Sequence, residues 1–125
     1  MTRVLVIDDS GTMRKIQKNV LTTLGVTEVV EAENGQEAIL RMKEHQFDFK
    51  LVLCDWNMPI MDGITFLQKI RSVPQLKALP VVMVTTEGEK SKVVEAIQAG
   101  ANGYIVKPFT PDSLKARLTE YLGTT

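Results

Sequence analysis

The chain has 125 residues with fifteen basic and fifteen acidic side chains, which is the size of one domain and gives no net charge. A neutral chain offers no electrostatic attraction for nucleic acid or for an anionic membrane surface, so we expect neither as a partner. The single cysteine, Cys54, excludes an internal disulfide and fits a reducing compartment. The first apolar run is too short for a signal peptide, and we therefore expect a cytoplasmic protein.

Five short apolar runs along the chain predict strands. Apart from the second, they are nearly continuous rather than alternating, and continuous runs are typical of parallel strands that are covered on both faces. The runs span residues 4–7, 29–30, 51–54, 81–84 and 104–106.

Helical patterns alternate with these runs. Apolar residues three or four positions apart, with a capping residue before them or a glycine after them, predict five helices. The signals are Met13 to Leu24 ended by Gly25, Asn34 before Ala38, Asp62 before Phe66, Val93 to Ile97 ended by Gly100, and Thr110-Pro111 before Leu114.

Strict alternation of strands and helices predicts the fold class. The crossovers are long enough for right-handed βαβ units, so we expect a doubly wound α/β fold, a three-layer flavodoxin-like (βα)5 sandwich around a parallel five-stranded sheet. The pattern does not fix the strand order. We assume the strand order 2-1-3-4-5, which is the order of flavodoxin-like folds.

Polar residues follow four of the five apolar runs, at the point where each run ends. If the first and third strands are neighbours, three carboxylates meet at one edge of the sheet. At about 4 Å and an effective dielectric constant of about 20, each pair of carboxylates repels by roughly 4 kcal/mol. Such a cluster needs a cation, and an oxygen-only ligand set favours Mg²⁺ with a phosphate beside it. The residues are Asp8 and Asp9 after the first run, Asp55 after the third, Thr85 and Thr86 after the fourth, and Lys107 after the fifth.

Each of these features also has a purely structural explanation. An acid after a strand is often a helix cap, and Asp8, Asp9, Ser10 and Thr12 all compete to cap the first helix. Lys107 could be an ordinary loop lysine. A structural explanation suffices for any one of these residues. It is less satisfactory for all of them, because four of the five strand ends carry groups that suit a metal or a phosphate. The second strand instead ends in acids, which are expected for solubility at a sheet edge.

Four motifs stand in order along the chain: VIDDS (6–10), CDWNMPIMDG (54–63), MVTTE (83–87) and AGANGYIVKPF (99–109). In this order and at this spacing they resemble the receiver domain of two-component response regulators over essentially the whole chain. Within that family the chain is most similar to single-domain chemotaxis regulators of the CheY type. The resemblance implies one receiver domain over residues 1–125, without an effector domain.

The resemblance also implies roles for the residues at the strand ends. Asp55 is expected to accept a phosphoryl group from a phosphohistidine of a histidine kinase. Mg²⁺, or Mn²⁺ as a substitute, is expected on Asp9, on Asp8 through water, on Asp55 and on the backbone carbonyl of Asn57. Lys107 is expected to pair with a phosphoryl oxygen, and the bond between it and Pro108 is expected to be cis.

Two further residues form the expected switch. Thr85 is expected to hydrogen-bond a phosphoryl oxygen, after which Tyr104 rotates inward. The surface formed by the helix around 93–97, the strand 104–106 and the helix after Pro111 then changes and binds a target. The implied partners are a histidine kinase, a protein target such as the flagellar motor switch, and a phosphatase. The implied protein is a monomeric signalling protein rather than an enzyme, although it assists its own phosphorylation and dephosphorylation.

Three positions near the expected site need separate comment. Trp56 follows a strand end, and we expect its side chain to be exposed. Ile60 and Thr86 stand where relatives often carry a polar residue and an alanine, respectively. Because both flank the expected phosphoryl pocket, they bear on the lifetime of the phosphorylated state.

Three other functions compete with this interpretation. Residues 4–12 faintly resemble the start of haloacid-dehalogenase-type phosphatases, but Ser10 replaces the second aspartate, so the general acid of that chemistry is missing. A flavodoxin-like FMN carrier is disfavoured because the acids would repel the FMN phosphate and the first turn is not rich in glycine. A phosphorelay intermediate shares the receiver chemistry and differs only in its pathway, so it stays open as an alternative.

Overall fold

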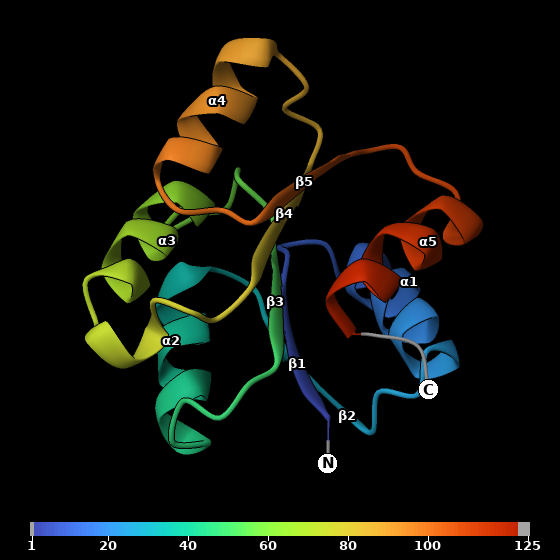
Figure 1. Ribbon diagram of the computed structural model, residues 1–125, viewed down its shortest axis with the longest axis horizontal. Helices are drawn as coiled ribbons and strands as arrows, with labels where there is room; N and C mark the ends of the chain where they lie inside the picture. The colour runs from blue at the N-terminus through green and yellow to red at the C-terminus, as the bar shows by residue number, and fades with distance from the viewer. Residues whose placement is uncertain (1, 123–125) are drawn as a thin grey trace.

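In residues 2–122, which the computed structural model describes, five parallel strands form one sheet with helices on both faces (Figure 1). The strand order β2-β1-β3-β4-β5 confirms the order assumed for this fold class. The first and third strands are therefore neighbours, and Ile7 pairs with Cys54 at their ends. The strands are β1 (Arg3–Ile7), β2 (Glu28–Ala32), β3 (Leu51–Cys54), β4 (Val81–Thr85) and β5 (Gly103–Val106).

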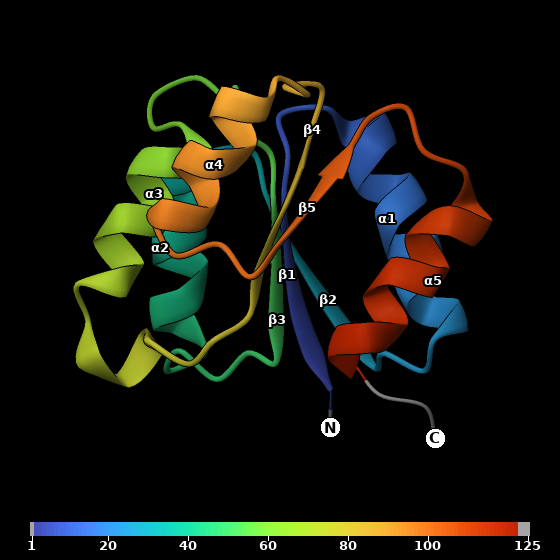
Figure 2. The ribbon, with the colours of Figure 1, turned by 45° about the horizontal axis from the view of Figure 1, so that its top comes forward.

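The helices form the two outer layers. One layer holds α1 (Gly11–Thr23) and α5 (Pro111–Leu122), and the other holds α2 (Gly35–Glu44), α3 (Gly63–Arg71) and α4 (Lys90–Gln98) (Figures 1 and 2). A short 3₁₀ turn, Pro74–Leu76, follows α3. Across the described part of the chain, no helix has the length and apolar character that crossing a bilayer requires.

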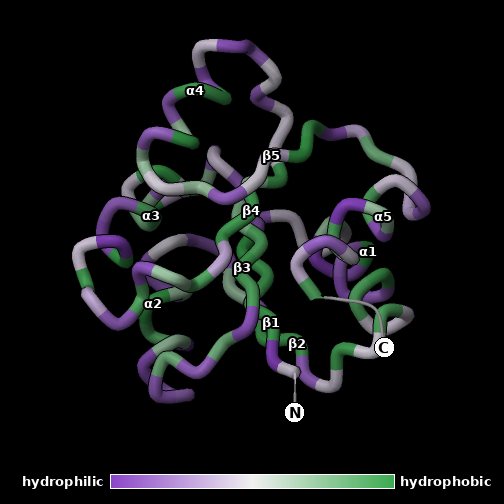
Figure 3. Tube along the Cα trace, viewed as in Figure 1, coloured by the Kyte–Doolittle hydropathy of each residue, from purple (hydrophilic) through white to green (hydrophobic). Residues whose placement is uncertain are grey.

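Two apolar clusters hold the layers together, one on each face of the sheet. Val4 and Val6 of β1 pack with α1 and α5, whereas Leu5 and Ile7 pack with α2, α3 and α4. The central strands are mostly hydrophobic, whereas hydrophilic residues are concentrated in the helices and loops around them (Figure 3). Because both faces of the sheet are buried, the strands need continuous rather than alternating apolar runs, as predicted.

The predicted caps begin the helices. Of the residues that compete before α1, the structure selects Ser10, whose Oγ accepts a hydrogen bond from the backbone N–H of Met13 at 3.3 Å. Equivalent side-chain caps precede three other helices. They are Asn34 before α2, Asp62 before α3 and Thr110 before α5.

Trp56 contradicts the expectation that its side chain is exposed, since only 6% of the residue's surface is accessible. The chain does not run outward after β3, because the N–H of Gly63 donates to the Trp56 carbonyl at 2.9 Å and folds residues 57–62 back into a loop. The indole belongs to the apolar cluster under α2, α3 and α4. The ammonium of Lys92, on α4, lies 5.0 Å from the ring centroid. A residue that follows a strand is therefore buried when the loop after it closes tightly.

The close approach at Gly63 yields a test of this loop. A methyl group at Gly63 would collide with the backbone carbonyl of Asp55, which cannot move without disturbing β3. We expect Gly63→Ala to lower the free energy of unfolding by about 2–3 kcal/mol in urea titrations. Gly11, also the first residue of a helix, is a matched control, because the nearest atom to its added methyl is 3.5 Å away on Arg14. Equal stability changes for Gly63→Ala and Gly11→Ala would contradict the packing described here.

Candidate functional site

Two neighbouring strands deliver carboxylates to the same edge of the sheet. The N–H of Asp8 donates to the carbonyl of Ala32 at 3.0 Å, and the N–H of Asp55 donates to that of Ile7 at 2.9 Å, so both acids continue the backbone ladders of the sheet. Asp9 follows at the turn into α1. One carboxylate oxygen from each of Asp8, Asp9 and Asp55 lies within 4.8 Å of the other two. The structure thus brings together the three acids that the sequence places at strand ends.

Lys107 joins these acids from the far side of β4. Its backbone N–H donates to the carbonyl of Thr85 at 2.8 Å, and the peptide bond to Pro108 is cis, as expected. Its ammonium lies 2.7 Å from Oδ2 of Asp8 and 3.2 Å from Oδ2 of Asp55. Charge-assisted hydrogen bonds of this kind are about twice as strong as neutral ones. Lys107 is therefore part of the acidic cluster and not an ordinary loop lysine.

The cluster carries more negative than positive charge. Burial raises the pKa of Asp8, whose residue is only 1% exposed, although hydrogen bonds from Lys107 and from the Ser10 N–H act in the opposite direction. Burial also acts to lower the pKa of Lys107, but its hydrogen bond to Asp8 and the charges of Asp55 and Asp8 outweigh burial and raise it. One ammonium faces three carboxylates, so the cluster can accept further positive charge.

The carboxylate oxygens fit a hard divalent cation. Oδ1 of Asp8 accepts from the Ser10 N–H at 2.9 Å, and Oδ1 of Asp55 accepts from the Trp56 N–H at 2.7 Å, so both buried carboxylates are held in fixed orientations. Asp9 is exposed and leaves the cluster open to solvent. Three converging carboxylates with oxygen ligands are typical of sites for Mg²⁺ or Mn²⁺ and unlike sites for zinc.

A second group of polar residues lies beside the acids. Thr85 is the last residue of β4 rather than the residue after it; it is fully buried, and its Oγ1 accepts from the Glu87 N–H at 3.3 Å. Tyr104 lies inward, 9% exposed, and its hydroxyl donates to the carbonyl of Glu87. Burial, with smaller effects from nearby acids, raises the pKa of Tyr104 to about 12. The side-chain amide of Asn57 donates to Oε1 of Glu87 at 2.8 Å.

Sequence reasoning missed two residues of this region. Glu87 contacts Thr85, Tyr104 and Asn57, and its position just beyond β4 was a signal of the same kind as those used for the other strand ends. Arg14 donates to the Asp8 carbonyl at 2.7 Å and to Glu31 at 3.0 Å. Nothing in the α1 pattern distinguishes this arginine. Glu31 therefore helps to hold the site, beyond the solubility role inferred for the acids of its strand.

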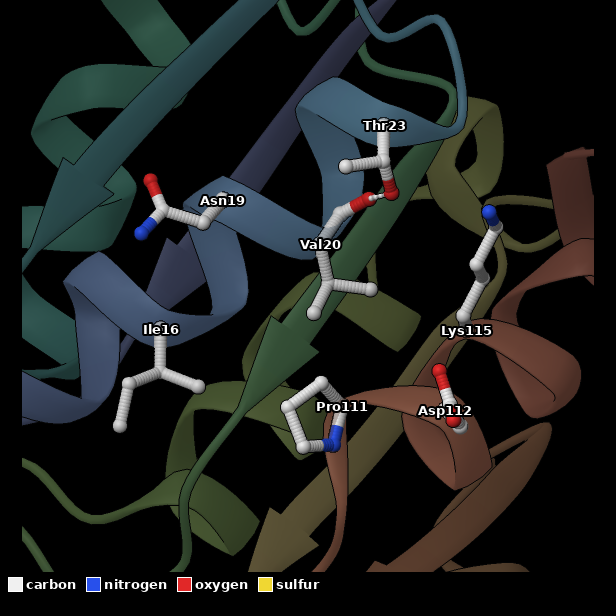
Figure 4. Close-up of a pocket in the computed structure, with 7 residues that line it drawn as sticks. All are labelled: Ile16, Asn19, Val20, Thr23, Pro111, Asp112 and Lys115. Carbon is white, nitrogen blue, oxygen red and sulfur yellow. Dashed lines mark hydrogen bonds between the residues drawn. The ribbon is translucent and has the colours of Figure 1, made fainter.

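A separate groove lies between α1 and α5, on the face of the sheet away from α4 (Figure 4). Its volume is about 360 Å³, and Asp112 and Lys115 are the charged residues among those that line it. Ile16, Val20 and Pro111 make much of its lining apolar. Unlike the residues of the acidic cluster, these residues do not resemble a metal or phosphate site.

Comparison with known proteins supports one family. The model of the response regulator receiver domain matches residues 4–119. The chemotaxis protein CheY1 of Helicobacter pylori is 49% identical over 122 residues, which cover 98% of each chain. The chemotaxis protein CheY-3 of Vibrio cholerae is 49% identical over 116 residues, which cover 93% of this chain and 88% of that protein.

Solved structures show the same fold. A CheX–CheY–BeF₃–Mg²⁺ complex from Borrelia burgdorferi contains a chain with a TM-score of 0.89 and 30% identity, covering 97% of this chain and 89% of that one. The chemotaxis protein CheY4 of Vibrio cholerae has a TM-score of 0.87 and 36% identity, covering 97% and 98%.

The raised pKa of Asp8 predicts how stability depends on pH. A carboxyl whose folded pKa exceeds its usual value of 3.8 supports folding most below that pH, and its contribution is lost as the pH rises through the folded pKa. At pH 7 the buried charge of Asp8 therefore opposes folding. In metal-free buffer we expect Asp8→Asn to raise the free energy of unfolding at pH 7 by about 1 kcal/mol, and we expect the gain to shrink as the pH falls through the raised folded pKa and to disappear below about pH 4.

The measurement is a urea titration at several pH values, with Asp48→Asn as the control. Asp48 is exposed at the opposite end of the sheet, near Arg3, and its neutralisation should bring no gain at pH 7. A loss of stability in Asp8→Asn at neutral pH would show that the ion pair with Lys107 outweighs the cost of burial.

Proposed function

The chain belongs to the response regulator receiver domain family, and from this membership we propose that it is a signalling switch activated by phosphorylation of Asp55. The observation that carries the proposal is the convergence of Asp8, Asp9 and Asp55 within 4.8 Å, with the Lys107 ammonium bonded to two of them. A histidine kinase is the proposed donor of the phosphoryl group. The protein is a signalling protein, and catalysis is limited to its own phosphorylation and dephosphorylation.

In the proposed reaction, a carboxylate oxygen of Asp55 attacks the phosphorus of a phosphohistidine. The new O–P bond forms as the P–N bond breaks, and the departing imidazole nitrogen keeps the electron pair and takes up a proton. The product is an aspartyl phosphate. Little covalent help is needed in phosphoryl transfer, so positioning and charge balance decide the rate. The hydrogen bonds from the Trp56 N–H and from Lys107 hold the Asp55 carboxylate in place for this attack.

Charge balance is the main difficulty of this reaction, since an anion attacks an anionic group. Lys107 can pair with an oxygen of the transferred phosphoryl group, because its ammonium already lies 3.2 Å from Oδ2 of Asp55. Asp8, Asp9, Asp55 and the backbone carbonyl of Asn57 are the proposed ligands of Mg²⁺. When bound, Mg²⁺ would supply positive charge that offsets the repulsion between the acids and the phosphoryl oxygens.

The proposed output passes through Thr85 and Tyr104. A phosphoryl group on Asp55 adds about one to two negative charges and three strong acceptors, and Thr85 carries the side-chain hydroxyl of β4, the strand next to β3. The Glu87 segment, which bonds both Thr85 and Tyr104, connects this hydroxyl to β5. Tyr104 is already inward, in the orientation that the family resemblance assigns to the activated state. Phosphorylation would then stabilise this arrangement and the α4–β5–α5 surface that goes with it.

The proposed pathway is chemotaxis, because relatives about half identical to the chain carry the name of chemotaxis proteins. The proposed target is a protein such as the flagellar motor switch. A phosphatase is a further proposed partner, since one similar structure is a CheX–CheY complex. We also propose that the chain acts as a cytoplasmic monomer. A phosphorelay intermediate would use the same site, and the names of the relatives favour chemotaxis over it.

Labelling with a small donor tests the acceptor. With Mg²⁺ and phosphoramidate, we expect the wild-type chain to gain one phosphoryl group in intact-mass spectra, with a change in Trp56 fluorescence. Asp55→Asn should show neither change, because it lacks the attacking oxygen. Asp48→Asn removes an exposed acid at the other end of the sheet and should be labelled normally. Labelling that survives in Asp55→Asn would move the acceptor to another residue.

The role of Thr85 can be tested separately from labelling. Thr85→Ala should still be phosphorylated on Asp55, but it loses a hydrogen bond to a charged group, worth about 1.5–3 kcal/mol. Hydrogen exchange in α4 and β5 should therefore respond to phosphorylation in the wild type and hardly at all in this variant. Thr85→Ser keeps the hydroxyl and should respond as the wild type does. If the alanine variant responded fully, the signal would not pass through this hydroxyl.

A further inference from the structure

Ile60 combines two unfavourable properties at one position of the loop between β3 and α3. Its φ is 69°, in the left-handed region, where a β-branched side chain is strained and Gly or Asn is preferred. Its accessible surface is 77% exposed, so the side chain contributes little to the core. An asparagine would relieve the strain and expose no apolar surface. Neither the backbone nor the core accounts for an isoleucine here, and strain of this kind points to a functional contact.

The loop holds Ile60 close to the acceptor. Gly63 lies directly against the backbone carbonyl of Asp55, and the carbonyl of Met61 accepts from the N–H of Gly35 on α2 at 3.0 Å. Because Ile60 is three residues from Gly63, its backbone lies within about 11 Å of that contact. We therefore expect a protein that presents a phosphohistidine to Asp55 to contact this loop.

The neighbours of Ile60 in the loop behave differently. Met58 and Met61 are partly buried and pack against the apolar cluster under α2, α3 and α4. Their presence is explained by packing within the chain. Pro59 and Ile60 are exposed, and Ile60 is the larger, aliphatic side chain of the two, on the loop that begins two residues after Asp55.

We propose that Ile60 is a specificity residue for the protein donor, and that it contacts an apolar surface beside the donor's phosphohistidine. This inference rests on the proposed function and adds a recognition element to it. A small donor contacts only the polar groups around Asp55, whereas a protein donor also contacts the loop that carries Ile60. An apolar contact on this loop gives affinity for the donor without adding charge to a cluster in which one ammonium already faces three carboxylates. Ile60 thus acts on donor binding and leaves the chemistry at Asp55 unchanged.

Other exposed apolar residues lack this combination. Leu40, on α2, is 56% exposed but lies within a regular helix. Val94, Ile97 and Val106 lie on α4 and β5, the surface already proposed for the target. Ile60 alone among these five residues adds backbone strain and a position beside the acceptor.

Two donors that share a P–N bond test the proposal. Phosphoramidate presents that bond without a protein surface, and a phosphorylated chemotaxis histidine kinase that labels the wild-type chain presents it with one. For Ile60→Asn we expect phosphorylation by phosphoramidate to stay within about twofold of the wild type. With the kinase as donor, we expect KM to rise about tenfold, the change that loss of one good interface contact brings, with little change in kcat. Tm should rise by about 3–6 °C as the strain is relieved.

Two control variants accompany this one. Ile60→Val keeps a β-branched apolar side chain and should retain most of the affinity for the kinase. Leu40→Gln removes an exposed apolar side chain away from the pocket and should leave both donors unaffected.

Each outcome decides the matter. Normal transfer from the kinase to Ile60→Asn would refute the proposal. Equal slowing with both donors would also refute it, because Ile60 would then act on the pocket rather than on the donor. An equal defect in Leu40→Gln would show that a general loss of apolar surface is responsible. Failure of phosphoramidate to label the wild-type chain at all would instead overturn the proposed function itself.

Discussion

The ammonium of Lys107 lies between two buried carboxylates, 2.7 Å from Asp8 and 3.2 Å from Asp55, and a third carboxylate, Asp9, lies beside them. Burial of the Asp8 charge costs stability, as its raised pKa indicates, whereas the raised pKa of Lys107 shows that the acids around it favour its charge. Hydrophobic burial elsewhere must offset the cost at Asp8. A cluster with excess negative charge can bind a cation, and it can bind an anionic group when a cation is bound with that group. The same imbalance that weakens the fold therefore creates the capacity for chemistry.

The parallel sheet keeps these charges together. Asp8 and Asp55 are bonded through their backbones to Ala32 and Ile7, and so each carboxylate is fixed by the ladder between two neighbouring strands. Repulsion between the acids cannot separate them unless β1 separates from β3. That separation would expose the most deeply buried residues of the protein, because both faces of these strands are covered by helices. A rigid core thus holds an arrangement that flexible loops could not maintain.

Some of this could be predicted from the sequence and some could not, for physical reasons. Apolar runs and capping residues such as Asn34 and Asp62 act locally, so the strands and helices were predictable from their own residues. The pairing of β1 with β3 is a tertiary fact that no local pattern encodes, and its prediction relied on a known topology. The burial of Trp56 was missed because it depends on the N–H of Gly63, seven residues further along the chain.

The hydrogen bonds around Thr85 differ in kind from those that hold the acids. Its Oγ1 accepts from the Glu87 N–H at 3.3 Å, a long bond between neutral groups, whereas Lys107 and Asp8 are charged and 2.7 Å apart. A neutral bond of that length is worth about 1 kcal/mol or less, and a bond to a charged acceptor is worth about 1.5–3 kcal/mol. The bond from Glu87 uses the oxygen of the Thr85 hydroxyl and not its proton, so a new anionic acceptor on Asp55 can take that proton without disturbing the lysine. The proposed switch needs this asymmetry: a strong, fixed set of charges beside a weakly held hydroxyl that a single phosphoryl group can draw toward itself.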